Sequence, residues 1–125
     1  MEKIIAACKP EPIHFRKYID IETKNLVTEP FIGYLGSGIK DKHGREIFEE
    51  DTLLIDFDRA AKVIGDVFLV RYLIERKFSP DARLKVEFRD ARFRLIWREH
   101  NASFDTGFDV SDIYVISKFV EIEED

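Results

Sequence analysis

A stretch from Leu84 to Arg98, in which apolar and charged side chains alternate, constrains the fold more than any other feature of the sequence. A period of two is typical of strands that bury one face, and two such runs meet at Asp90-Ala91. Folding the stretch back there places three apolar pairs on one face: Phe88 with Phe93, Val86 with Leu95, and Leu84 with Trp97. The sequence therefore predicts an antiparallel hairpin in this register, with Trp97 buried in the core.

The turn of this hairpin can be built in two ways that keep the same register. A two-residue turn at Asp90-Ala91 favours Gly at its second position, and it sets Arg89 against Arg92. A four-residue loop from Arg89 to Arg92 removes that contact between like charges, so we expect the longer loop. In either case Glu87 lies opposite Arg94, which is a favourable cross-strand pair.

A second hairpin is predicted from Ile39 to Ile47. A three-residue loop over residues 42–44, with Gly44 in the left-handed region, gives a type I turn followed by a G1 bulge. The resulting cross-strand pairs are Asp41 with Arg45, Lys40 with Glu46, and Ile39 with Ile47. Asp41 and Gly44 are thus the predicted structural residues of this turn.

The rest of the chain also favours short strands. Strands are predicted for 52–57, 67–72 and 113–122, and a strand, a turn at 22–25 and a second strand for 14–27. The segment that contains 67–72 also has helical spacing at Leu69, Tyr72 and Leu73, and residues 73–83 receive no assignment. A short helix is predicted at 58–64. We expect a mainly β fold with little helix: a small SH3-like barrel or a curled antiparallel sheet.

The size and composition of the chain fit one domain spanning residues 1–125, with an N-terminal segment, 1–30, packed on a barrel formed by 31–125. Hydrophobic residues make up 45% of the 125 residues, which excludes wholesale disorder. The apolar runs are too short for a membrane span or a signal peptide. The single cysteine, Cys8, is predicted in an N-terminal strand, and it indicates a reducing compartment. We therefore expect a cytoplasmic protein without a membrane partner.

Charge is unevenly distributed along the chain, whose formal net charge is −5. Residues 83–98 carry six basic and two acidic side chains, whereas residues 99–125 carry one basic and eight acidic side chains. The candidate contacts for a polyanion or an interface are Lys85, Arg89, Arg92, Arg94 and Arg98. Because an acidic protein is repelled on average by nucleic acid, we favour a face whose cations pair with acidic neighbours over a nucleic-acid site.

The residue types that catalysis or metal binding would need are scattered. No Gly-x-Ser-x-Gly motif is present, and one cysteine excludes a zinc motif built on cysteine pairs. The glycine-rich segment 33–38 lacks the Lys-Ser/Thr pair of a phosphate-binding loop, so we interpret it as a strand bend. The acidic residues Glu46, Glu49, Glu50 and Asp51 lack the spacing of a calcium loop and are predicted as an exposed connection. We expect no enzyme, no catalytic residue, no cofactor and no metal.

The segment from Gly38 to Asp51, Gly-Ile-Lys-Asp-Lys-His-Gly-Arg-Glu-Ile-Phe-Glu-Glu-Asp, resembles the hallmark stretch of the YopX-like family of phage and prophage proteins. Weaker similarities follow in the family's order at 14–26, 65–67, 86–93 and 113–114. The chain departs from the family pattern at Glu50 and Ala91, where glycine is usual, and at Ser111-Asp112. The resemblance implies a mainly β, SH3-like architecture and an origin in a mobile element, and it implies no reaction.

Three non-enzymatic functions follow as hypotheses. The first is a self-associating binding or assembly module, in which the basic 83–98 segment and the acidic 99–125 segment of different copies make head-to-tail contacts. The second is weak nucleic-acid binding through the 83–98 hairpin. The third is an acidic inhibitor that occupies the basic site of a host or phage protein with Asp109, Asp112 and the tail 121–125. We favour the homo-oligomer.

Overall fold

The computed structural model describes residues 10–124 and divides the chain into two compact units, 1–35 and 36–124. We call them unit 1 and unit 2, and each is described by itself. The predicted strand around Cys8 lies outside the described residues, as does Asp125 of the acidic tail. The predicted packing of residues 1–30 on the rest of the chain stays a prediction.

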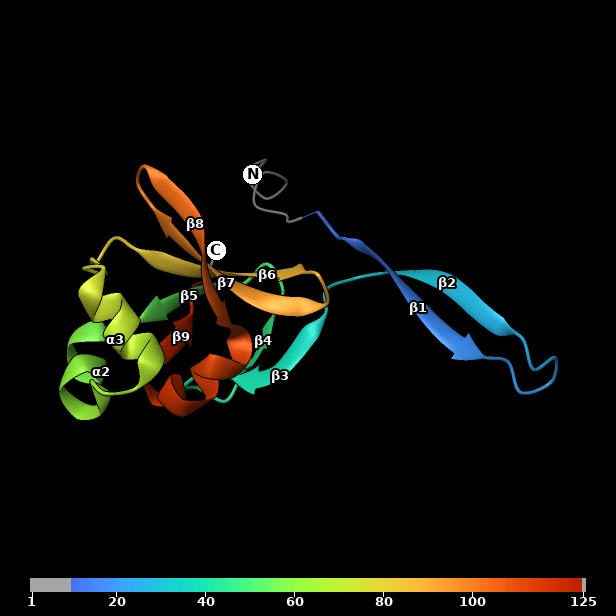
Figure 1. Ribbon diagram of the computed structural model, residues 1–125, viewed down its shortest axis with the longest axis horizontal. Helices are drawn as coiled ribbons and strands as arrows, with labels where there is room; N and C mark the ends of the chain where they lie inside the picture. The colour runs from blue at the N-terminus through green and yellow to red at the C-terminus, as the bar shows by residue number, and fades with distance from the viewer. Residues whose placement is uncertain (1–9, 125) are drawn as a thin grey trace. The chain divides into compact units, whose positions relative to one another are not determined.

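Unit 1 is an antiparallel hairpin of β1 (Ile13–Ile19) and β2 (Leu26–Ile32) (Figure 1). The carboxylate of Asp20 holds the connecting turn by accepting hydrogen bonds from the backbone N–H groups of Glu22 and Thr23, at 2.8 and 3.0 Å. The predicted succession of strand, turn and strand is confirmed, because the alternation of side chains and the polar turn at 20–25 both act locally.

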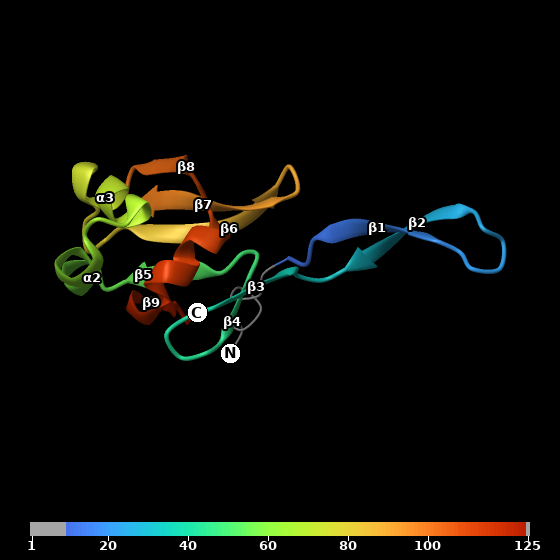
Figure 2. The same cartoon turned by 60° about the horizontal axis from the view of Figure 1, so that its bottom comes forward.

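Unit 2 is built on a five-stranded antiparallel sheet with the order β8-β7-β6-β5-β9 (Figure 2). Its strands are β5 (Thr52–Ile55), β6 (Arg83–Arg89), β7 (Arg92–Glu99), β8 (Ala102–Asp109) and β9 (Val120–Ile122). A separate pair, β3 (Gly36–Lys40) and β4 (Glu46–Phe48), forms the second hairpin. The predicted strand at 52–57 is confirmed only to Ile55, since Phe57 begins a helix.

The hairpin of β6 and β7 has the predicted register, with Phe88 opposite Phe93, Val86 opposite Leu95 and Leu84 opposite Trp97. The predicted four-residue loop is wrong, because Arg89 and Arg92 pair directly across a two-residue turn. Asp90 and Ala91 both have positive φ, 52° and 63°, which is the backbone of a type I′ turn. Leu84, Val86, Leu95 and Trp97 are buried, so burial of the strand pair outweighs both the strain in the turn and the contact between the two arginines.

The hairpin of β3 and β4 turns as predicted. The Asp41 N–H donates to the Arg45 carbonyl at 2.9 Å, and Gly44 has φ +81°. Lys40 pairs with Glu46, but the expected Ile39–Ile47 pair is absent from the described register, which shifts between Gly36 and Lys40. Gly38, at φ +80°, lies at that shift, so the glycine-rich segment bends the strand there.

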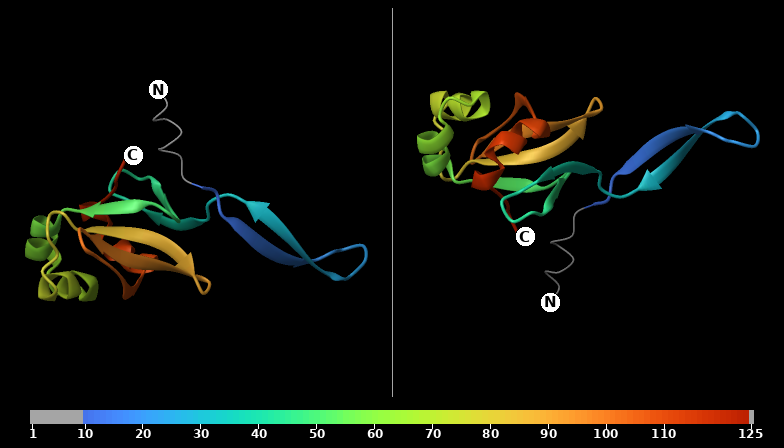
Figure 3. Two further views of the ribbon diagram at one scale, coloured as in Figure 1. Left: turned by 90° about the horizontal axis from the view of Figure 1, so that it is seen from above. Right: turned by 90° about the horizontal axis from the view of Figure 1, so that it is seen from below.

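Two α-helices lie side by side at one end of the sheet (Figure 3). The first, α2 (Phe57–Ile64), confirms the predicted helix. The second, α3 (Phe68–Glu75), replaces the predicted strand at 67–72. Leu69, Val70 and Leu73 are almost completely buried, which the helical spacing allows and a strand with alternating faces does not. Packing against the sheet therefore decides in favour of the helical alternative.

The predicted strand at 113–122 is also wrong for most of its length. Residues Val110–Phe119 form η1, a 3₁₀ segment with a kink at Ile116, and only β9 follows as a strand. The side chains of Val110, Ile113, Ile116 and Phe119 are buried, and their spacing of three matches a 3₁₀ helix, in which every third side chain lies on one face. Asp109 and Asp112 form a capping box at its start.

The fold is mainly β, with 45% strand and 23% helix, so the expectation of little helix is wrong. The sheets are antiparallel and open, and the SH3-like barrel is not confirmed. One core joins the inner face of the five-stranded sheet to α2, α3 and η1, with Trp97 buried as predicted. Each of the described helices, of ten residues at most, falls short of the length and apolar character needed to cross a bilayer.

Candidate functional site

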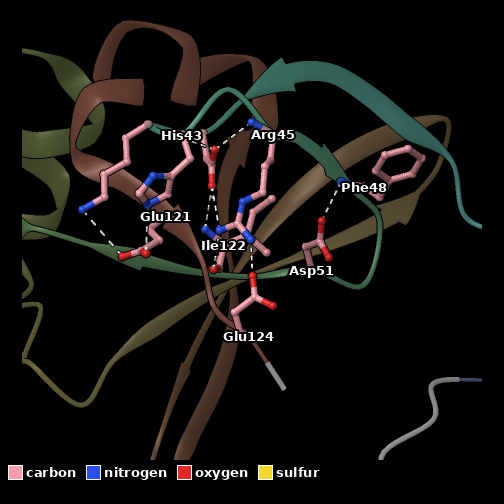
Figure 4. A network of polar contacts seen from close by, with 9 residues as sticks. His43, Arg45, Phe48, Asp51, Glu121, Ile122 and Glu124 are labelled. Carbon is pink, nitrogen blue, oxygen red and sulfur yellow. Dashed lines mark hydrogen bonds and ion pairs between the residues drawn. The ribbon is translucent and has the colours of Figure 1, made fainter.

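A network of polar contacts surrounds Asp41, at the turn between β3 and β4 (Figure 4). Its side chain is completely buried. One carboxylate oxygen, Oδ1, accepts hydrogen bonds from the backbone N–H groups of His43 and Arg45, at 2.9 and 3.0 Å. The other, Oδ2, accepts from the backbone N–H of Ile122 in β9, at 3.1 Å. Asp41 therefore shapes its own turn and attaches that turn to a strand 81 residues away.

Arg45 strengthens the same attachment. Its Nη2 lies 3.2 Å from Asp41 Oδ2 and donates to the carbonyl of Ile122 at the same distance, while its Nη1 pairs with Glu124. The backbone N–H of Lys42 donates to the carbonyl of Val120 at 2.8 Å. The turn thus occupies hydrogen-bonding groups along the outer edge of β9, which is an edge strand of the sheet.

Two further side chains of the turn reach the same strand. The Nε2 atom of His43 lies 3.0 Å from a carboxylate oxygen of Glu121, and Nζ of Lys42 lies 3.6 Å from the other. The hydrogen bond from His43 lowers the pKa of Glu121, helped by the charge of Lys42 and opposed by desolvation. These contacts are exposed, so they add to the attachment less than the buried carboxylate does.

Burial raises the pKa of Asp41, but its hydrogen bonds from backbone N–H groups and the charge of Arg45 outweigh that effect and leave the pKa lowered. The pKa of Arg45 is raised, chiefly by its hydrogen bond to Glu124 and against a smaller effect of desolvation. Both groups are charged at neutral pH. They form an ion pair in which both carboxylate oxygens already accept hydrogen bonds. Such an arrangement is typical of a residue that holds two segments together rather than of a proton-transfer site.

The acidic residues after β4 form a second tight turn. Oδ2 of Asp51 accepts a hydrogen bond from the backbone N–H of Phe48 at 2.8 Å, and Glu50 has φ +74°. The backbone N–H of Glu50 bonds to the carbonyl of Val86 at 2.7 Å, which joins the turn to β6. Within residues 10–124, no three side chains of the types that bind metals gather closely enough to hold an ion.

The predicted basic residues of β6 and β7 are largely paired with carboxylates. Lys85 lies 3.1 Å from Glu50, Arg89 2.5 Å from Glu87, Arg92 3.5 Å from Asp109, and Arg94 3.1 Å from Asp105. Arg94 lies opposite Glu87 as predicted, but its ion pair is with Asp105 of β8. Arg98 is exposed, and among residues 10–124 it has no ion pair.

The geometry of the Asp41 turn and of the Glu50 turn accounts for the segment from Gly38 to Asp51, which is the most distinctive part of the sequence. Comparison with protein families matches residues 4–119 to the family described as YopX protein. The chain belongs to the YopX protein family. No curated protein and no solved structure matches the chain.

Two positions at which the sequence departs from the resemblance described above have left-handed backbone. Glu50 has φ +74° and Ala91 has φ +63°. Glycine adopts such angles at little cost, whereas residues with a Cβ are strained there. Both turns therefore have a backbone that glycine favours, although neither position holds glycine.

The surface that sequence reasoning missed lies on unit 1. One face of the hairpin of β1 and β2 presents five large apolar side chains, each 60–68% exposed: Ile13, Phe15, Ile19, Leu26 and Ile32. The other face carries an ion pair of Arg16 with Glu29. The alternation of apolar residues at 13, 15 and 19 and again at 26 and 32 was the signal, and only the register shows that both sets share one face.

Proposed function

We propose that this YopX family member is a non-enzymatic, self-associating binding or assembly module, encoded by a phage or prophage and forming homo-oligomers. The observation that carries the proposal is the apolar face of the unit 1 hairpin. A two-stranded hairpin is marginally stable by itself in water, and it needs further strands or a packed partner to cover its apolar face. A second copy of the chain is present wherever the first one is, and it supplies such a partner.

The energy available from that face is large enough to drive association. Complete burial of one Ile, Leu or Phe side chain contributes about 1.5–3 kcal/mol. The five side chains of the face are each about two-thirds exposed, so covering them offers several kcal/mol against the cost of association. The buried carboxylate of Asp41 is engaged in attaching the turn to β9, which supports a structural role for the hallmark segment.

The pairing of Lys85, Arg92 and Arg94 with carboxylates argues against nucleic-acid binding through the β6–β7 hairpin. A phosphate would have to displace those carboxylates, and the net charge of −5 opposes its approach.

The mass in solution tests the proposal. At about 100 μM and 0.15 M salt, light scattering should give a multiple of 14.7 kDa for the unmodified chain. Phe15→Asp places a charge in the apolar face and should shift the chain toward monomer. Val63→Asp is the control, because Val63 is equally exposed but lies on α2 of unit 2. A monomer under these conditions for the unmodified chain would overturn the proposal.

A further inference from the structure

The two outer edges of the unit 1 hairpin differ in their ability to accept another strand. The hydrogen bonds of Asp20 N–H to the Asn25 carbonyl, 2.9 Å, and of Gly33 N–H to the Pro12 carbonyl, 3.2 Å, frame the ladder. Even-numbered residues of β1 therefore bond to β2, and the backbone groups of its odd-numbered residues, 13 to 19, point outward. The outward-pointing residues of β2 include Pro30, which has no N–H. Only β1 offers an uninterrupted edge.

Unit 2 also has one closed and one open edge. The turn that contains Asp41 covers β9, as described above. At the other edge of the sheet, β8 follows β7 across a two-residue turn at 100–101 (Figure 2). In that ladder the backbone N–H and C=O groups of Ser103 and Asp105 point away from β7. The register then shifts toward Asp109, so the open edge is the short segment 102–105.

An apolar groove lies beside this edge, on the face of the sheet that α3 covers. Phe68, Tyr72 and Phe108 line it together with Arg71 and Glu75, and its volume is about 340 Å³. Phe68 is 76% exposed, and Phe104 of β8, stacked on Trp97, is 41% exposed. A strand that joins β8 would bring its alternate side chains over this groove.

We propose that β1 of one copy pairs in parallel with β8 of a second copy, with Phe15 beside Phe104 and Ile19 directed toward the groove of Phe68, Tyr72 and Phe108. The inference rests on the proposed self-association and names the two surfaces that meet. The parallel direction is the one in which the faces agree, because an outward-pointing residue of β1 such as Phe15 then lies opposite a residue of β8 that bonds to β7, here Phe104. In that register Arg16 lies opposite Asp105 on the other face of the sheet. The charges agree as well, because β1 carries Arg16 and Lys17 while β8 carries Asp105 and Asp109.

A pairing of β1 with the β1 of another copy is less favourable. In the register that pairs the whole of β1, it would bring Arg16 of one copy opposite Arg16 of the other, without the carboxylate that Asp105 of β8 offers. The contact of β1 with β8 is instead heterologous, so it joins copies head to tail and closes into a ring or extends.

Proline substitutions test the edge. Lys17→Pro removes an outward N–H from β1, and Thr28→Pro removes an outward N–H from β2 directly opposite. Lys17→Pro should weaken association at least tenfold in sedimentation analysis, whereas Thr28→Pro and Lys17→Ala should change it less than threefold. An equal loss from Lys17→Pro and Thr28→Pro would overturn the choice of β1.

Cross-linking tests the partner strand. In a Cys8→Ser background, chains with His14→Cys on β1 and chains with Ser103→Cys on β8 are mixed and treated with a short bifunctional thiol reagent. We expect dimers that contain one chain of each kind, and chains with both substitutions should give a ladder of higher masses. A cross-link only within single chains, or dimers only of the His14→Cys chain, would overturn the inference while an oligomeric mass still supports self-association. A monomeric mass would overturn both proposals.

Discussion

The hairpin of β3 and β4 and the hairpin of β6 and β7 both have tight turns, but different interactions stabilise them. In the hairpin of β3 and β4, the turn residues suit the turn: Gly44 occupies the left-handed position, and Asp41 accepts hydrogen bonds from the backbone of the turn. In the hairpin of β6 and β7, Asp90 and Ala91 both adopt left-handed angles, which suit Asp90, but alanine stands at the second position, where a type I′ turn favours glycine. The first turn is specified by its own residues, whereas the second is imposed by the burial of its strands.

The difference shows where stability resides in each hairpin. The strands β3 and β4 are short, and their turn is joined to β9 by the carboxylate of Asp41. The strands β6 and β7 form the centre of the sheet and bury Leu84, Val86, Leu95 and Trp97. Changes in the first turn should therefore be costly, and changes in the second turn should be tolerated or favourable.

The largest effect is expected from Asp41→Ala. Its removal leaves the partly buried N–H groups of His43, Arg45 and Ile122 without their acceptor and Arg45 without its buried partner, so we expect a loss of about 2–4 kcal/mol in the free energy of unfolding. Chemical denaturation at pH 7 measures it. His43→Ala, which removes only an exposed contact with Glu121, is the control and should cost less than about 0.5 kcal/mol. Equal effects of the two substitutions would contradict the distinction between the hairpins.

Lowering the pH should remove the stabilisation that the ionised carboxylate of Asp41 provides. Because the pKa of Asp41 is lowered in the folded protein from its ordinary value of 3.8, the ionised carboxylate stabilises the fold at all pH values above 3.8. That stabilisation is lost as the pH falls below 3.8 and through the lowered pKa. Denaturation between pH 7 and pH 2 should show a steeper decline for the unmodified chain than for Asp41→Asn. Parallel curves would assign the acid sensitivity to other carboxylates, such as Glu121.

Gly44→Val should destabilise the chain by about 1–2 kcal/mol, because a β-branched residue resists φ +81°. A Cβ at this position meets open space, so the loss reports backbone strain alone. Thermal unfolding at constant protein concentration measures it. Unchanged stability would mean that the turn does not need the left-handed residue.

Ala91→Gly should have the opposite effect and increase the free energy of unfolding. Glycine relieves the strain at φ +63°, and after the greater flexibility of the unfolded chain is deducted, we expect a gain of about 0.5–1 kcal/mol. The same denaturation experiment measures the gain. A loss of stability would show that this turn, like the first, is held by its own residues.

The smallest effect is expected from Arg94→Ala, at most about 0.5 kcal/mol, because its partly exposed pair with Asp105 is one of many contacts between β7 and β8. The affinity for DNA and RNA, measured by fluorescence anisotropy at 0.15 M salt, should be negligible before and after the change. Binding of DNA or RNA by the unmodified chain that disappears in a correctly folded Arg92→Ala, Arg94→Ala double variant would instead support a nucleic-acid site on β6 and β7.

The sequence by itself determined the features that depend on neighbours along the chain. The alternation in β6 and β7 gave the register, because a shift of one residue would expose every buried side chain. Gly44 placed the left-handed residue of the first turn, and the alternation at 14–27 gave the hairpin of unit 1. Asp41 and Arg45 were recognised as turn residues. The sequence did not show that they also attach this turn to β9.

Only the tertiary structure decided the rest. The segment of Leu69, Val70 and Leu73 is compatible with a strand or a helix until the sheet is present to bury it. The two-residue turn places Ala91 where glycine is preferred, and it forms because the burial of β6 and β7 outweighs that local strain. The carboxylate of Asp41 meets Ile122 across 81 residues, and no local pattern encodes that contact. Local energies of about 1 kcal/mol choose turns and strand faces, and the larger energy of burial overrides them wherever distant segments meet.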